Sequence, residues 1–208
     1  MTWHDALGFC AWLTEAWAQH LPPGWVVTLP SEAEWEMAAR GGEQVPAWPM
    51  PFVAADAVQV LQRGLAAPNV ANPLPRRAFP WGEDFDPDRA NVQQLVGEPS
   101  AVGAFAGGSS PVGAEDLAGN VWEWTRSLFG RNWTKPDFSY PYRVGDAGRE
   151  DAGAKDDVHR VVRGGSWIDH ADYARCACRD WSPPDERNLI LGFRVVLRSS
   201  PVSRAAGA

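Results

Sequence analysis

Residues 163–197 read RGGSWIDHADYARCACRDWSPPDERNLILGFRVVL, and we expect the rest of the chain to be organised around them. The stretch begins with a Gly-Gly pair and ends in an apolar run from Leu191 to Leu197. Glycine permits backbone conformations closed to other residues, and arginine can join loop carbonyls and carboxylates through its guanidinium group. We therefore interpret one set of residues as a rigid framework: Arg163, Gly164, Gly165, Trp167, Arg175, Arg179, Arg187, Gly192, Phe193 and Arg194.

The residues between these positions follow neither a helical nor a strand period. Leu189 and Ile190 stand where a polar turn would be expected, and the same stretch supplies Tyr173 and Trp181. Apolar and aromatic side chains exposed on a rigid support are typical of a recognition surface. The alternative is that these side chains fill a small satellite core under the loop.

The whole chain has 208 residues, enough for one well-packed core, and we expect a single domain over residues 1–198 followed by a tail at 199–208. Its 12 Trp, 20 Gly and 18 Pro indicate a compact, loop-rich fold in which large rings fill irregular spaces. A net charge of −7 gives no basic surface for nucleic acid. There is no apolar run long enough to span a bilayer and no resemblance to a signal peptide at the N-terminus. We expect a cytoplasmic protein without a nucleic-acid or membrane partner.

The three cysteines, Cys10, Cys176 and Cys178, do not indicate a disulfide framework, because their number is odd. Cys176 and Cys178 would share one side of an extended strand, but their spacing is not that of a zinc or redox motif. We expect buried or partly buried thiols that pack as small hydrophobic residues.

Two helices are predicted near the N-terminus. The first runs from Thr2 to about residue 19, with Thr2 as its cap and apolar residues at helical spacing. The second follows a short strand at 25–29; Ser31 and Glu34 form a capping box, and a Gly-Gly pair at 41–42 ends the helix.

Residues 43–78 differ from the rest: they are rich in proline, poor in charge, and only 53–65 has the pattern of a helix. We interpret them as an insertion or a long surface excursion. The acidic run at 83–88 that follows is not spaced like an EF-hand loop and is predicted to be a solvated loop. Residues 127–157, rich in Gly, Asp and Tyr, are also predicted as loop, and 158–162 as a strand.

The most distinctive short motif is DLAGNVWEWT at 116–125, which predicts a strand entered from a Gly-Asn turn. Asp116 and Glu123 bracket that turn. Carboxylates together with turn carbonyls are the hard oxygen ligands that Ca²⁺ requires. The alternative is that Asp116 only forms the turn and Glu123 is a carboxylate paired with a cation.

Several motifs in order resemble the formylglycine-generating-enzyme (sulfatase-modifying factor) family over nearly the whole chain outside the excursion. They are TWHDA at 2–6, LPSEAEWE at 29–36, PWG at 80–82, GNVWEW at 119–124, RGGSW at 163–167 and GFRV at 192–195. The resemblance implies an α+β fold of the C-type-lectin type, with two N-terminal helices, short twisted antiparallel sheets and much irregular loop. The strands that usually precede the first helix in that family are absent from this sequence.

The family contains enzymes and proteins that are not enzymes, so the resemblance alone does not assign an activity. It implies a calcium site at Asp116, Gly119, Val121 and Glu123, the middle two through their carbonyls. The second calcium site of the enzymes would begin near Asn91, but the short loop after it has no matching acid. The copper-binding cysteines of the oxidases are five positions apart; Cys176 matches the second, whereas the first falls on Ala171. A lone thiolate cannot provide two-sulfur ligation of Cu(I), so we expect no copper and no formylglycine generation.

Iron is likewise not expected. The related iron enzymes that form sulfur–carbon bonds in ergothioneine-type synthesis depend on a His-rich site held mainly by an additional helical domain. This chain has only four histidines, and they are scattered along the sequence.

The stretch that ends in GFRVVL is similar to the variable proteins of diversity-generating retroelements, which display exchangeable side chains on this fold and bind ligands. We therefore predict a non-catalytic ligand-binding module with a protein or other macromolecule as partner. The alternative is a metal-dependent oxidising enzyme of the sulfatase-modifying or ergothioneine-synthesis kind, acting as a fragment or with a partner domain. The predicted binding residues are Ile168, Asp169, His170, Tyr173, Asp180, Trp181, Ser182, Glu186, Asn188, Leu189 and Ile190.

Overall fold

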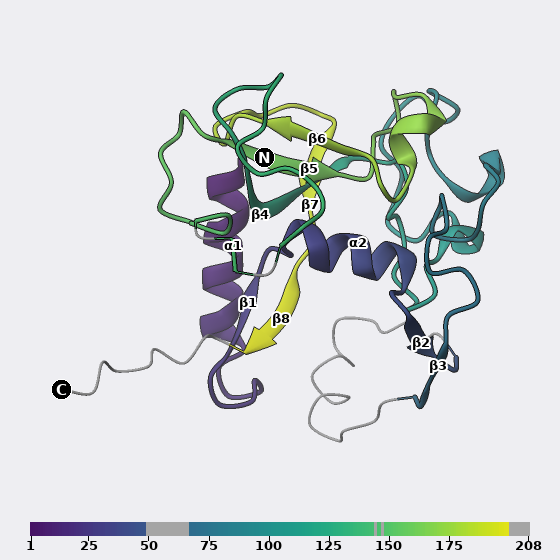
Figure 1. The fold of residues 1–208 in the computed structure, drawn as a ribbon, viewed down its shortest axis with the longest axis horizontal. Helices are drawn as coiled ribbons and strands as arrows, with labels where there is room; N and C mark the ends of the chain where they lie inside the picture. The colour runs from purple at the N-terminus through teal and green to yellow at the C-terminus, as the bar shows by residue number, and fades with distance from the viewer. Residues whose placement is uncertain (49–66, 144, 147, 200–208) are drawn as a thin grey trace.

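The computed structural model describes residues 1–48, 67–143, 145–146 and 148–199 (Figure 1). In chain order its helices and strands are α1 (Trp3–Ala16), β1 (Trp25–Thr28), α2 (Glu32–Arg40), β2 (Gln44–Pro46), β3 (Asn69–Ala71), η1 (Pro87–Arg89), η2 (Ala106–Gly108), β4 (Trp122–Gly130), β5 (His159–Arg163), η3 (Ala171–Ala174), β6 (Arg179–Ser182), β7 (Leu191–Phe193) and β8 (Val196–Ser199). Two α-helices, short strands and long irregular connections confirm the α+β class. The helix predicted at 53–65 and most of the tail predicted at 199–208 lie outside the described residues.

Both helices begin where their capping residues predict. The Thr2 hydroxyl accepts the Asp5 amide and the Asp5 carboxylate accepts the Thr2 amide, and Ser31 and Glu34 repeat this exchange at the start of α2. Gly41 ends α2 in the left-handed conformation, with φ of 85°. Side-chain and backbone polar groups that would otherwise lack partners are thereby satisfied at these helix ends.

The largest sheet has the order β6-β5-β4-β7, and β4 pairs in parallel with β7, whereas its other pairs are antiparallel. A second sheet joins β1 to β8, and a third joins β2 to β3 at the base of the excursion predicted for 43–78 (Figure 1). The prediction of loop from residue 127 onward is wrong for the first four residues, because β4 continues to Gly130 with Leu128 and Gly130 paired to β5. The apolar run 191–197 is divided between two sheets.

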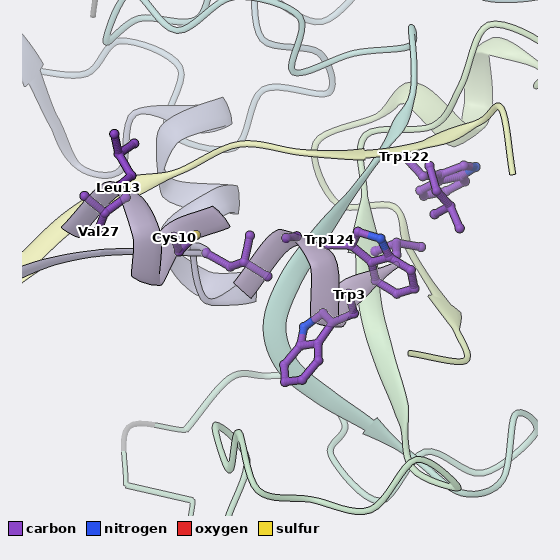
Figure 2. Close-up of a cluster of buried hydrophobic side chains, with 10 residues drawn as sticks. Trp3, Cys10, Leu13, Val27, Trp122 and Trp124 are labelled. Carbon is purple, nitrogen blue, oxygen red and sulfur yellow. The ribbon is translucent and has the colours of Figure 1, made fainter. Parts of the chain in front are cut away.

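The main core lies where α1 packs against β1 and β4. Figure 2 shows this cluster extending from Leu13 and Val27 at one end to Trp122 at the other, with Trp3 and Trp124 between them. The two central indoles of this cluster find acceptors: Trp3 Nε1 donates to the Thr125 carbonyl at 2.9 Å, and Trp124 Nε1 to the Met1 carbonyl at 3.2 Å.

A buried carboxylate joins several of the predicted framework arginines. Glu32, at the start of α2, is fully buried and accepts two hydrogen bonds from Arg179, at 2.7 and 2.9 Å. Arg163, also fully buried, lies 3.3 Å from Glu32 and donates to the Cys176 carbonyl at 2.6 Å. Arg149, in the loop between β4 and β5, places its Nη2 3.6 Å from Glu32 Oε2. These contacts tie α2, β5 and β6 together.

Candidate functional site

The turn after β5 requires glycine. Gly164 and Gly165 both have positive φ, 101° and 72°. A Cβ on Gly165 would lie 3.0 Å from the carbonyl carbon and oxygen of Tyr173, so only glycine allows η3 to pack this closely on the turn. The Gly-Gly pair thus directs the chain from the sheet into the surface segment 166–173.

This segment is fixed by Asp169. Its Oδ2 accepts from the Ser166 amide at 2.9 Å, the Ser166 hydroxyl at 2.5 Å and Trp122 Nε1 at 2.9 Å. The segment is also held from below, because the carbonyls of Trp167 and Asp169 accept the amides of Gln94 and Gln93. Asp169, predicted as a ligand-binding residue, therefore uses one carboxylate oxygen to hold the support.

Three apolar or aromatic side chains stand out from this support: Ile168 is 40% exposed, Tyr173 47% and Leu189 79%. His170 and Asn188 are exposed beside them in the sequence. Trp122 connects the two segments, since its ring contacts that of Tyr173 edge-on at 6.2 Å and its amide donates to the Ile190 carbonyl at 2.8 Å. We name Ile168, His170, Tyr173, Asn188 and Leu189 the exposed surface.

Ile190 is intermediate, because its side chain packs partly against the main core. The satellite-core alternative therefore describes Ile190 in part, but not Tyr173 or Leu189.

Three predicted residues, Asp180, Trp181 and Ser182, lie in a strand and do not join the exposed surface. Residues 179–182 form strand β6 against β5, so alternate side chains point to opposite faces. Ser182 is buried, and Trp181 stacks on His159 with 4.3 Å between the ring centroids. Asp180 lies on the other face from Trp181, where its charge interacts with that of Asp169. Sequence reasoning missed this strand because its residues, Arg-Asp-Trp-Ser, lack an apolar alternation.

Glu186 and Asn188 shape the loop that carries Leu189. Asn188 Nδ2 donates to Glu186 Oε1 at 3.2 Å, and Asn188 Oδ1 accepts the Ile190 amide at 3.1 Å. Sequence reasoning also missed Trp122 and Ser166 as supports; the available signal was the WEW motif, interpreted only as a strand.

Three of the four residues predicted to bind calcium, Asp116, Val121 and Glu123, line a hollow of about 410 Å³ together with Val102, Phe193 and Arg194; Gly119 is not part of its lining. Arg194 donates to both carboxylate oxygens of Glu123, at 2.5 and 2.7 Å, and Trp35 Nε1 donates to Oε2 at 2.7 Å. Asp116 Oδ2 accepts the Gly103 amide at 2.7 Å, and no described residue donates to its other oxygen. Glu123 is thus paired with a cation in this structure, and calcium binding by Asp116, Gly119, Val121 and Glu123 stays a prediction.

The described thiols do not fit a two-cysteine copper site. Cys176 packs fully buried with Trp35 and Leu117, and burial raises the pKa of its thiol to about 12. Cys178 instead packs partly against the main core. The two thiols lie in different clusters, and residues 175–178 form a turn rather than an extended strand. Position 171 is a buried alanine. Within the described ranges, no group of three His, Cys, Asp or Glu side chains is placed to hold a metal ion, and no helix is long and apolar enough to cross a membrane.

Comparison with known proteins identifies relatives with different reported roles. Residues 1–199 match the family model described as sulfatase-modifying factor enzyme 1-like domain. Hercynine oxygenase of Mycolicibacterium thermoresistibile is 41% identical over 125 residues, covering 58% of this chain and 26% of that protein. Inactive C-alpha-formylglycine-generating enzyme 2 of Bos taurus is 31% identical over 211 residues, covering 93% of this chain and 48% of that protein.

Among solved structures, Treponema denticola variable protein 1 superposes with a TM-score of 0.54 at 22% identity, covering 96% of this chain and 69% of that one. This likeness concerns the fold. The chain spans half or less of the length of the two curated relatives.

Proposed function

The chain belongs to the sulfatase-modifying factor enzyme 1-like domain family, and from that premise we propose that it is a ligand-binding module without catalytic activity of its own. Its ligand, a protein or other macromolecule, would contact the exposed surface. The observation that carries the proposal is the contrast between exposed Ile168, Tyr173 and Leu189 and the hydrogen-bonded support beneath them. A rigid support reduces the entropy lost on binding.

The proposal predicts that the exposed side chains can be replaced without unfolding the protein. A library that randomises Ile168, Tyr173 and Leu189 should leave most members folded, because exposed substitutions usually change stability by no more than about 0.5 kcal/mol. A matched library randomises the fully buried Leu29, Leu117 and Val161 and should leave few members folded. The measurement is the fraction of displayed variants that resist protease. Equal losses in the two libraries would contradict the proposal.

The family resemblance to retroelement variable proteins adds a genomic test. An adjacent reverse-transcriptase gene, with a template repeat nearly identical to the coding sequence for the C-terminal stretch, would support diversification of this surface.

The second candidate function is the substrate-facing part of an iron oxygenase, and it is favoured by the 41% identity to hercynine oxygenase. In that case the exposed surface would close a site whose iron ligands come from another domain. The protein is mixed with a separately produced domain that supplies the iron ligands, and with Fe(II), hercynine and a thiol, while oxygen is monitored. Oxygen uptake above that of the iron-binding domain alone, lost when the added chain carries Tyr173→Ser, would replace the first proposal with the second.

A further inference from the structure

Carboxylates outnumber guanidinium groups along the segment that forms the exposed surface. Residues 169–187 contain five acidic residues and three basic ones: Asp169, Asp172, Asp180, Asp185 and Glu186 against Arg175, Arg179 and Arg187. These arginines do not neutralise all five carboxylates, because each arginine forms its ion pair with one particular acidic residue.

Arg179 turns inward to the buried Glu32, as described above. Arg187 donates to Asp5 of α1 at 2.8 Å, and Arg175 lies 3.9 Å from Asp172. Among the described residues, Asp180, Asp185 and Glu186 form no ion pair with any Lys, Arg or His. The loop that carries Leu189 therefore presents uncompensated negative charge next to an apolar side chain.

Asp180 is held at a cost. Burial raises the pKa of its carboxyl group, the hydrogen bond from the Trp181 amide opposes that change, and the nearby Asp169 carboxylate raises the pKa further. A partly buried carboxylate without a counter-ion destabilises the free protein, and a cationic group on a partner would offset that cost.

The aromatic part of the surface favours the same kind of partner. The Tyr173 ring is 47% exposed and meets Trp122 only at an edge. An exposed ring face attracts Lys or Arg through a cation–π interaction, and Leu189 beside Ile190 offers an apolar contact. The geometry points to a basic protein segment, with an apolar side chain flanked by Lys or Arg, as the ligand of the exposed surface. This inference rests on the binding function proposed above.

The sign of the charge separates this partner from two other classes. Nucleic acids and anionic membrane surfaces would be repelled by Asp185 and Glu186, since both require basic groups on the protein. A basic protein segment would instead be attracted over about 8–10 Å at physiological ionic strength, and its affinity would fall as salt rises.

The probe is a phage-displayed library of random dodecamer peptides, selected on the full chain in 50 mM NaCl. Selected peptides are then titrated against wild type and three variants. The charge variant is Asp185→Asn/Glu186→Gln, and the surface variant is Tyr173→Ser/Leu189→Ser. The matched control is Glu15→Gln/Glu43→Gln, which removes the same charge at exposed positions in the last turn of α1 and before β2, at the end of the molecule opposite to β6 (Figure 1).

We expect the selected peptides to be rich in Lys, Arg and apolar residues. The charge variant should bind them about tenfold more weakly, since two exposed charge contacts contribute roughly this much together, and the control should stay within about twofold. Raising NaCl to 300 mM should weaken wild type more than the charge variant.

Two other outcomes are distinguishable. Peptides that depend on Tyr173 and Leu189, but are not basic or ignore the charge variant, would overturn the partner class and leave the binding function standing. If no peptide discriminates wild type from the surface variant, the binding function fails and the partner class with it. Melting temperatures of all variants close to wild type show that the differences arise at the surface.

Discussion

Replacing Glu32 by glutamine should be among the most damaging conservative changes in this protein. The carboxylate is fully buried and serves Arg179, Arg163 and, more distantly, Arg149. Breaking a buried ion pair by neutralising one partner costs about 3–5 kcal/mol, because the remaining charge is left without compensation. Arg163 keeps Glu36 at 2.7 Å and Arg149 keeps Asp146 at 3.2 Å, so we expect the lower end, about 3 kcal/mol.

For a chain of this length, about 3 kcal/mol corresponds to a fall in melting temperature of roughly 6–12 °C. Guanidinium chloride unfolding followed by far-UV circular dichroism measures the free energy of unfolding of Glu32→Gln. The control is Glu15→Gln on the exposed face of α1, which should change that free energy by no more than about 0.5 kcal/mol. A Glu32→Gln protein as stable as the control would refute the view that this carboxylate holds the framework together.

Three further predictions concern charged groups. The pKa of Asp180 in the folded state is raised above 3.8, so the charged carboxylate makes the folded protein less stable as pH rises. The melting temperature of Asp180→Asn should therefore be higher than that of wild type at pH 7, and the two should be equal below pH 3.8. Burial of Glu34 acts to raise its pKa, but hydrogen bonds from Arg126 and Ser31 lower it below 4.5. Wild type should therefore be more stable than Glu34→Gln by the full amount above pH 4.5, and the difference in stability should disappear as pH falls through the lowered pKa. Thermal melts at successive pH values measure this difference. If calcium binds at residues 116–123, then CaCl₂ should raise the melting temperature by several degrees, EDTA should reverse the rise, and Asp116→Asn should abolish it; an unchanged melting temperature would mean that Arg194 alone balances Glu123.

Features set by neighbours in the sequence could be predicted, and features set by distant pairing could not. The capping boxes at Thr2 and Ser31 depend on residues three positions away, so their sequence signals were sufficient. Strand β6 depends on its pairing with β5, which lies sixteen or more positions earlier and leaves no period in Arg-Asp-Trp-Ser. That is why Trp181 and Ser182 were predicted at the surface.

The exposure of some side chains after β5 could be expected from the sequence, whereas their role in binding stays a prediction. The Gly-Gly pair indicated a backbone conformation closed to other residues, which its positive φ angles bear out, and the segment after it carries exposed Ile168 and Tyr173. The support beneath it was not predicted, because the bond from Trp122 to Asp169 joins residues 47 positions apart. The sequence left two alternatives for Glu123, a calcium ligand or a carboxylate paired with a cation. It could not identify Arg194 as that cation, because the two residues are 71 positions apart.

The pairing of β1 with β8 has a practical consequence for handling this protein. Strand β8 follows the loop of Leu189 by only a few residues, yet its four register pairs bind it to residues 25–28 of the N-terminal half. A tag, tether or surface anchor fused after Ser199 would therefore pull on the β1–β8 pair, and strand β7 lies between that pair and the turn that carries Leu189. Immobilisation through this end should leave the turn free and identically oriented on every molecule, which suits the protein to oriented arrays and single-molecule pulling.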